Sequence, residues 1–81
     1  MFIRSLQPEQ AMIFVYAPPQ YVGMWMKNTL IPLDMLFVDA DGCVVKVHER
    51  AEPGALETIP SDDPVVLVVE LAGGVASSLG L

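Results

Sequence analysis

The densest group of residues that could carry out chemistry lies within five consecutive positions. It combines an aromatic ring, an ammonium group, a side-chain amide and a hydroxyl group, supplied by Trp25, Lys27, Asn28 and Thr29. An aromatic ring offers a surface on which a ligand stacks, and the polar groups offer hydrogen bonds that orient it. This stretch therefore predicts a binding site for a carbohydrate or another small polar ligand.

A structural interpretation of the same residues competes with this one. In it Trp25 belongs to the core, Lys27 extends its ammonium group to water, and Asn28 and Thr29 fix a β-bulge through hydrogen bonds to the backbone. The two interpretations differ in one observable property. A binding site requires Trp25 to be partly exposed beside a concavity, whereas a buried Trp25 without an adjacent pocket removes the main argument for binding.

Two carboxylates, Asp34 and Glu70, each interrupt an apolar stretch. Strand alternation places each among apolar neighbours, where burial penalises the charge unless a partner such as Lys27 or Arg50 compensates it. Structural hydrogen bonding and general acid or base catalysis are the two hypotheses. In the catalytic one, a small hydrolase or lyase acts on a saccharide through Asp34 or Glu70, with Lys27 stabilising negative charge. It requires all three side chains to reach one cavity.

The remaining reactive side chains form no recognisable site. Asp39, Asp41 and Gly42 fit a tight turn better than a calcium loop, whose glycine and glutamate fall at other positions. Cys43 and His48 are an odd number of residues apart on one strand, so they face opposite ways and make a poor thiolate–imidazole pair. We expect His48 at the surface, and we expect no metal and no cofactor.

The elements that would position these residues are mostly strands. Runs of β-branched, aromatic and other apolar residues predict strands at 12–16, 33–39, 43–48 and 64–71, with an alternating segment at 21–29. The strands 33–39 and 64–71 are expected to be central. Pro18 and Pro19 predict the end of the first strand, and Asp41 and Gly42 predict a hairpin.

Loops and short helices complete this prediction. Residues 52–54 and 59–63 are expected to be loops. One helical turn is expected near Ser5, Pro8 and Glu9. A second is expected within 72–81, where Val75 and Leu79 are four residues apart and Gly80 follows.

Composition limits the class of protein. The 81 residues fit one domain, and 53% hydrophobic against 17% charged residues favours a packed globule. Ten acidic against four basic residues give a net charge of -6, which argues against nucleic acid and anionic membranes as partners. No apolar run is long enough for a membrane helix or a signal peptide, so we expect a soluble chain. A single cysteine excludes an intrachain disulfide.

The run MWMKNTLIPLDMLFVDADG, residues 24–42, resembles the bacterial and archaeal family known as domain of unknown function one hundred ninety-two. The segments MFIRSL, AMIFVY, VHERAEP and PVVLVVELAGGVASSLGL are similar to the family in order and spacing. The resemblance implies a mainly β fold, a small antiparallel or mixed sandwich or partly closed barrel with one or two short helices, and no agreed activity. Ala11, Met24 and Arg50 stand where the family usually has glycine, an aromatic residue and asparagine.

The resemblance also bears on the ends of the chain. Family members usually carry a further strand before the position of Met1 and another after Leu81, so a single domain over 1–81 is expected to lack a terminal strand at each end. Open strand edges pair with other chains, which predicts a homodimer or poor solubility. The family often occurs behind export signals, which points to the envelope or periplasm if the true start lies upstream.

Three functions follow, in order of preference. The first is a noncatalytic binding or accessory domain that recognises a small polar ligand or a protein through the face from Trp25 to Thr29. The second is the small saccharide-acting enzyme described above. The third is a structural assembly module, which would show a large apolar surface instead of a pocket.

Overall fold

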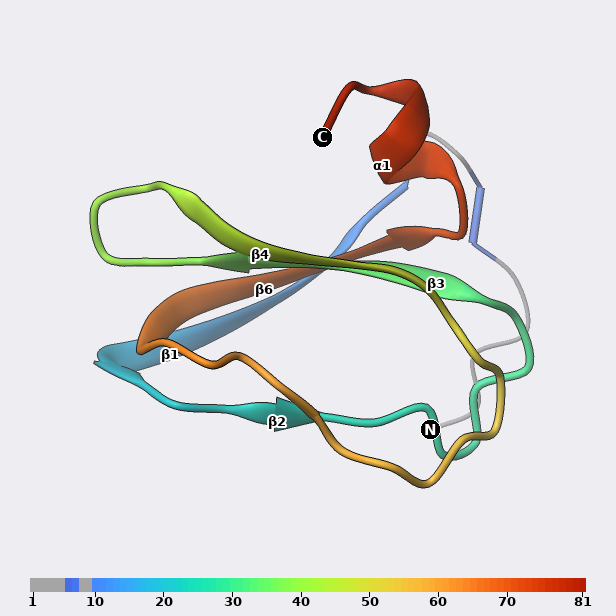
Figure 1. Cartoon of the computed structure of the whole chain (residues 1–81), viewed down its shortest axis with the longest axis horizontal. Helices are drawn as coiled ribbons and strands as arrows, with labels where there is room; N and C mark the ends of the chain where they lie inside the picture. Colours follow the sequence, from blue (N-terminus) through green and yellow to red (C-terminus); the bar gives the residue numbers. More distant parts are fainter. Residues whose placement is uncertain (1–5, 8–9) are drawn as a thin grey trace.

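The computed structural model describes residues 6–7 and 10–81, and this part of the chain contains six strands and one short helix (Figure 1). The helical turn predicted near Ser5, Pro8 and Glu9 falls largely on residues outside that description. The elements, in chain order, are β1 (Met12–Gln20), β2 (Gly23–Met24), β3 (Leu33–Val38), β4 (Val44–Ala51), β5 (Ile59–Pro60), β6 (Val65–Ala72) and α1 (Val75–Ser78).

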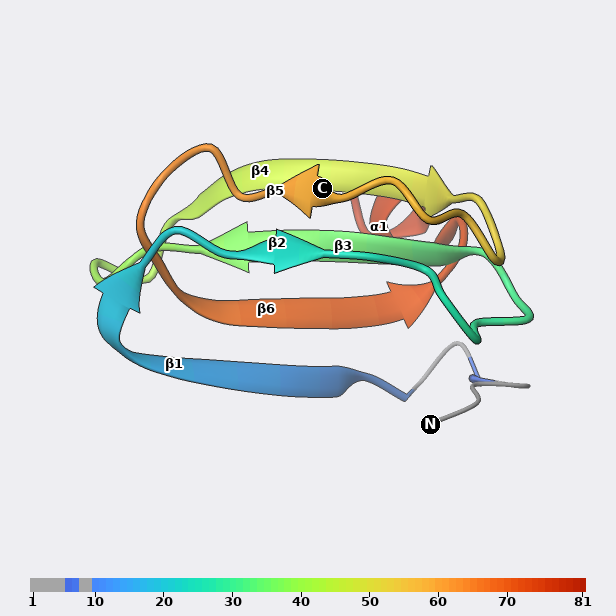
Figure 2. The ribbon, with the colours of Figure 1, turned by 90° about the horizontal axis from the view of Figure 1, so that it is seen from below.

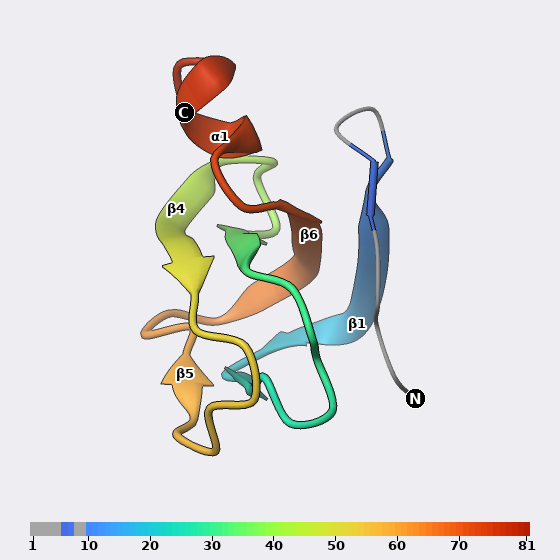
Figure 3. The same ribbon diagram turned by 90° about the vertical axis from the view of Figure 1, so that its right-hand side faces the viewer.

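The strands form two antiparallel sheets that lie in layers. The main sheet has the order β1-β6-β3-β4, and β2 pairs with β5 in a smaller sheet. The small sheet covers one face of the main sheet (Figure 2), and α1 lies on the opposite face (Figure 3). The mainly β prediction is confirmed, and the sheets do not close into a barrel. β3 and β6 are the inner strands, as predicted from their apolar sequences.

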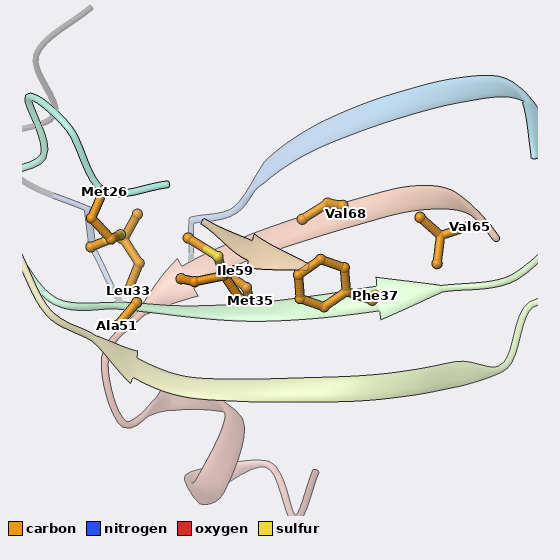
Figure 4. Close-up of a cluster of buried hydrophobic side chains, with 8 residues drawn as sticks. All are labelled: Met26, Leu33, Met35, Phe37, Ala51, Ile59, Val65 and Val68. Atoms are coloured by element: carbon orange, nitrogen blue, oxygen red, sulfur yellow. The ribbon is translucent and has the colours of Figure 1, made fainter. Parts of the chain in front are cut away.

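The main core lies between the two sheets. Alternation along β3 sends Leu33, Met35 and Phe37 to this side, where all three are fully buried. Figure 4 shows them beside buried side chains of the neighbouring segments, Met26, Ala51, Ile59, Val65 and Val68. A smaller cluster of Leu36, Leu71 and Ala76 lies under α1. The central strand is therefore covered on both faces.

The first strand is longer than predicted. Pro18 and Pro19 were expected to end it, yet β1 continues to Gln20. Val15 lies opposite Leu67 and Gln20 opposite Val65, so the four residues between Val15 and Gln20 face only one residue of β6, Val66. β1 is an edge strand, and prolines are tolerated in an edge strand where the ladder is irregular. The predicted end was wrong for this reason.

The second extended segment is shorter than predicted. Of residues 21–29, only Gly23 and Met24 form a strand, which pairs with Pro60 and Ile59. The prediction that 59–63 is loop throughout was therefore wrong at β5. A pairing of two residues leaves too little sequence for alternation to become visible.

The hairpin between β3 and β4 is confirmed. Gly42 has a φ of 83°, and its N–H donates to the carbonyl of Asp39 at 3.1 Å. The side chain of Asp39 accepts hydrogen bonds from the N–H groups of Asp41 and Cys43. β4 then extends to Ala51, three residues beyond the predicted end.

The predicted C-terminal helix is present as α1, and Gly80 follows it with a φ of 78°. Its buried residue is Ala76, whereas Leu79 is 64% exposed, so the apolar side differs from the predicted one. No helix among the described residues combines the length and apolar character needed to cross a membrane.

Candidate functional site

A cavity of about 270 Å³ opens between the main sheet and the segment around β2. β1 and β6 supply one side of it, and β2 and the turn that follows supply the other. We call it the Glu70 cavity. Its lining residues are Phe14, Tyr16, Gly23, Met24, Trp25, Lys27, Thr29 and Glu70. It therefore brings together three of the four predicted ligand-binding residues and one of the two predicted carboxylates.

Strand register places Glu70 at this cavity. Glu70 lies opposite Met12 on β1 and Met35 on β3, on the face of the main sheet that the smaller sheet covers. The residue is only 3% exposed, and burial raises the pKa of its carboxyl group. Within residues 6–7 and 10–81, no hydrogen bond or salt bridge reaches this carboxylate. Glu70 is thus a buried acid that faces a cavity.

Trp25 lies at the exposed side of the cavity. It is 52% exposed, whereas its neighbour Met26 is completely buried, so the structural interpretation that placed Trp25 in the core was wrong. The ammonium nitrogen of Lys27 lies 5.3 Å from the centre of the Trp25 ring, within range of a cation–π interaction. Trp25 thus has the partial exposure beside a concavity that the binding hypothesis requires.

The turn after β2 explains the positions of Asn28 and Thr29. The N–H of Thr29 donates to the carbonyl of Met26 at 3.0 Å, and Asn28 has a φ of 63°. Asparagine tolerates this left-handed conformation better than most residues. Thr29 is 4% exposed and lines the cavity, but Asn28 does not line it. Asn28 therefore shapes the turn that presents its neighbours.

Backbone hydrogen bonds of Met26 connect this turn to the loop after β4. Its N–H donates to the carbonyl of Ala55, and its carbonyl accepts hydrogen bonds from the N–H groups of Gly54 and Thr29. Met26 also lines a second cavity, described below, while Trp25 and Lys27 line the Glu70 cavity. Residues 25–27 therefore contribute to both cavities.

Asp34 lies on the other face of the main sheet and does not reach the Glu70 cavity. Its fully buried carboxylate accepts hydrogen bonds from the backbone N–H groups of Arg50 at 2.8 Å, Gly74 at 3.0 Å and Ala76 at 2.9 Å. The compensation expected from a side chain of Lys27 or Arg50 is supplied by backbone donors instead. Asp34, Glu70 and Lys27 do not share one cavity.

The second cavity, of about 290 Å³, lies between β4 and β5, and we call it the Lys46 cavity. Lys46 forms a salt bridge with Asp62 at 2.8 Å and donates a hydrogen bond to the carbonyl of Pro60. His48 is half-buried at this cavity, whereas a surface position was expected. Across the part of the chain that the structure describes, no three His, Cys, Asp or Glu side chains are arranged to hold a metal.

Sequence reasoning missed Phe14 and Tyr16 as cavity residues. Both are half-buried and lie two positions apart on β1, on the same face as Met12. The alternation in MIFVY was used to predict a strand, but it also places Phe14 and Tyr16 on one face, and this shared face was the available signal. The hydroxyl group of Tyr16 contacts the sulfur of Met24 at 3.6 Å.

The chain is similar to a family model and to solved structures over its full length. The model of the DUF192 family, described as an uncharacterized ACR, matches residues 1–81. A candidate transcription regulator from Sinorhizobium meliloti 1021 shares 42% identity with a TM-score of 0.94. A protein of unknown function from Novosphingobium aromaticivorans DSM 12444 shares 40% identity with a TM-score of 0.95.

Both solved structures cover 100% of this chain, while the chain covers 63% and 58% of theirs. It thus spans about three-fifths of their length. No curated protein matches the chain.

Proposed function

The chain belongs to the DUF192 family, and we propose that it is a noncatalytic binding domain that takes a small polar ligand in the Glu70 cavity. One observation carries this proposal. Trp25, Lys27 and Thr29 come from one layer and Glu70 from the centre of the other, yet all four line the same cavity. A binding site needs such convergence of polar groups on a concave surface.

The lining of the cavity supports a small ligand. Small-molecule pockets are mostly about 300 to 1,000 Å³, and a cavity of about 270 Å³ lies just below that range. Phe14 and Met24 supply apolar contact, and the hydroxyl groups of Tyr16 and Thr29 supply donors and acceptors. This combination of apolar walls and few polar groups is typical of a metabolite site.

The enzyme alternative has weaker support. Hydrolysis of a saccharide usually requires two carboxylates on either side of the scissile bond. Among the described residues, the Glu70 cavity contains Glu70 as its one carboxylate, since Asp34 lies on the opposite face. The raised pKa of Glu70 suits a general acid, but among the described residues no second carboxylate lines this cavity.

A regulatory role is compatible with binding but does not follow from charge. One similar protein carries the description of a candidate transcription regulator. The net charge of -6 argues against direct contact between this chain and nucleic acid. Ligand recognition is the activity that the geometry favours.

The proposal is tested by thermal shift of the wild-type protein against a broad panel of metabolites and glycans. We expect selective stabilisation by at least one compound, because a ligand that binds only the native state raises its stability. Trp25→Ala is expected to abolish this stabilisation. Tyr21→Ala is the matched control, because Tyr21 is 72% exposed and does not line the cavity. No stabilising compound, or stabilisation that survives Trp25→Ala, contradicts the proposal.

A further inference from the structure

Two opposite charges line the Glu70 cavity without pairing with each other. Glu70 and Lys27 both belong to the lining, yet no salt bridge joins them. Glu70 is 3% exposed, and Lys27 is exposed with its ammonium group beside the Trp25 ring. The cavity therefore has a negative group in its interior and a positive group near its opening.

The carboxylate of Glu70 would be stabilised by a cationic group on the ligand. Burying a carboxylate is unfavourable unless a cation or hydrogen-bond donors compensate it. Asp34 shows how this chain satisfies a structural carboxylate, with three backbone N–H donors. No described residue supplies a donor or a cation to Glu70. A ligand with an ammonium group would provide both charge and donors.

The ammonium group of Lys27, near the opening, would be stabilised by an anionic group on the same ligand. A simple amine would meet Glu70 but would be repelled by Lys27, and a simple anion would meet Lys27 but would be repelled by Glu70. A neutral sugar would leave both charges uncompensated. Only a molecule with both charges is complementary to both residues.

We propose that the Glu70 cavity binds a small zwitterion of the amino-acid class, with its ammonium group at Glu70 and its carboxylate at Lys27. The inference rests on the proposed function and names its ligand class. The apolar part of the ligand contacts Phe14, Met24 and the Trp25 ring. The hydroxyl groups of Tyr16 and Thr29 are the further hydrogen-bonding groups of the site.

The test is calorimetric titration of the wild-type protein with the twenty standard amino acids. The best binder is then compared with its amide, which lacks the carboxylate, and with its des-amino acid, which lacks the ammonium group. We expect each analogue to bind about 10-fold or more weakly, because each loses one charged contact. These comparisons need no variant, so they stand even if a substitution disturbs folding.

Two variants assign each charge to its residue. Glu70→Gln is expected to weaken binding of the amino acid about 10-fold without weakening binding of the des-amino acid, and Lys27→Met is expected to weaken binding of the amino acid without weakening binding of its amide. Equal binding of the three compounds, or variants without this selectivity, overturns the inference. If a neutral glycan stabilises the protein through Trp25 and no amino acid binds, this inference fails while the proposed function stands. If no compound of the metabolite and glycan panel binds, both fail.

Discussion

Asp34 on β3 and Glu70 on β6 lie one residue out of register on adjacent strands and therefore point to opposite faces of the same sheet. Asp34 is opposite Leu71, and Glu70 is opposite Met35. Both carboxylates are buried, but Asp34 accepts three backbone hydrogen bonds and Glu70 faces a cavity. Two acids with similar apolar surroundings in the sequence thus have different surroundings in the fold.

Replacement of Asp34 is expected to destabilise the protein strongly. Asp34→Asn removes the charge that holds the N–H groups of Arg50, Gly74 and Ala76 and replaces one of the two acceptor oxygens by an NH₂ donor. Hydrogen bonds to charged groups contribute about 1.5 to 3 kcal/mol each and are not additive, so we expect a loss of about 2 to 4 kcal/mol in the free energy of unfolding. Urea denaturation followed by circular dichroism measures it.

Asp39→Asn is the control for this loss. Asp39 also accepts two backbone hydrogen bonds, but at the exposed hairpin turn. We expect about 1 kcal/mol or less there, since water replaces lost partners at the surface. Equal losses for the two variants would show that Asp34 does not hold the chain around α1 in the way described.

The raised pKa of Glu70 predicts a specific pH dependence of stability. Burial raises this pKa above its ordinary value of 4.5, so the folded state binds the proton more tightly than the unfolded state does. This contribution to stability is fully present below the ordinary pKa and is lost as the pH rises through the raised pKa of the folded state. Glu70→Gln stays neutral and is expected to be more stable than the wild type above that pKa.

Urea denaturation of both proteins between about pH 4 and about pH 8 measures the difference. The advantage of Glu70→Gln should shrink toward the acidic end. Glu49→Gln, at an exposed position of β4, corrects for the loss of one negative charge. An advantage of Glu70→Gln that does not change with pH would argue against a buried, desolvated carboxyl group at this position.

Trp25 and Met26 are adjacent, and their replacement by alanine should have very different consequences. Trp25 is 52% exposed and Met26 is fully buried. We expect Met26→Ala to lower the free energy of unfolding by about 2 to 5 kcal/mol, because it leaves a cavity in the core. Trp25→Ala should stay within about 1 kcal/mol of the wild type. Thermal unfolding measures both variants. A large loss of stability in Trp25→Ala would show that Trp25 contributes to folding rather than to binding.

The apolar side chains on β1 predict weak self-association. β1 ends the main sheet, and on one of its faces Ile13 is 61% and Val15 is 72% exposed. Edge strands with exposed apolar side chains pair with other chains. Val15→Lys is expected to lower the apparent mass at high protein concentration in light scattering. Tyr21→Lys, an exposed residue outside every strand, controls for added charge. A monomeric wild type at all concentrations would contradict this prediction.

The inner strands and the hairpin could be predicted from sequence because their signals are local. PVVLVVEL and LDMLFV carry apolar side chains on both faces, and Asp41 with Gly42 specifies a tight turn. β2 and β5 could not be predicted, because a two-residue pairing between segments far apart in the chain leaves no periodic pattern. Arg50 has a φ of 47°, a left-handed conformation that asparagine adopts more readily than most residues, which accounts for the asparagine common at this position in the family. An arginine at this position gives no indication of that conformation.

The residue types of the candidate site could be predicted from the sequence, but their arrangement in space could not. The polar and aromatic residues around Trp25 are adjacent in sequence, so the sequence alone indicated that they form a group. Whether Asp34 or Glu70 joins them depends on the register between β3 and β6, and a shift of one residue exchanges the faces. That register is a tertiary property, set by the packing of the whole sheet.

One short segment of backbone contributes to both cavities, because Met26 lines the Lys46 cavity and its neighbours Trp25 and Lys27 line the Glu70 cavity. Met26 is anchored to the loop at Gly54 and Ala55 and to the turn that presents Thr29. A ligand that moves this segment at one cavity is therefore expected to change the shape of the other cavity. Thermodynamic linkage then requires that, if a ligand in one cavity changes the affinity of the other cavity for its ligand, the second ligand changes the affinity for the first by the same factor.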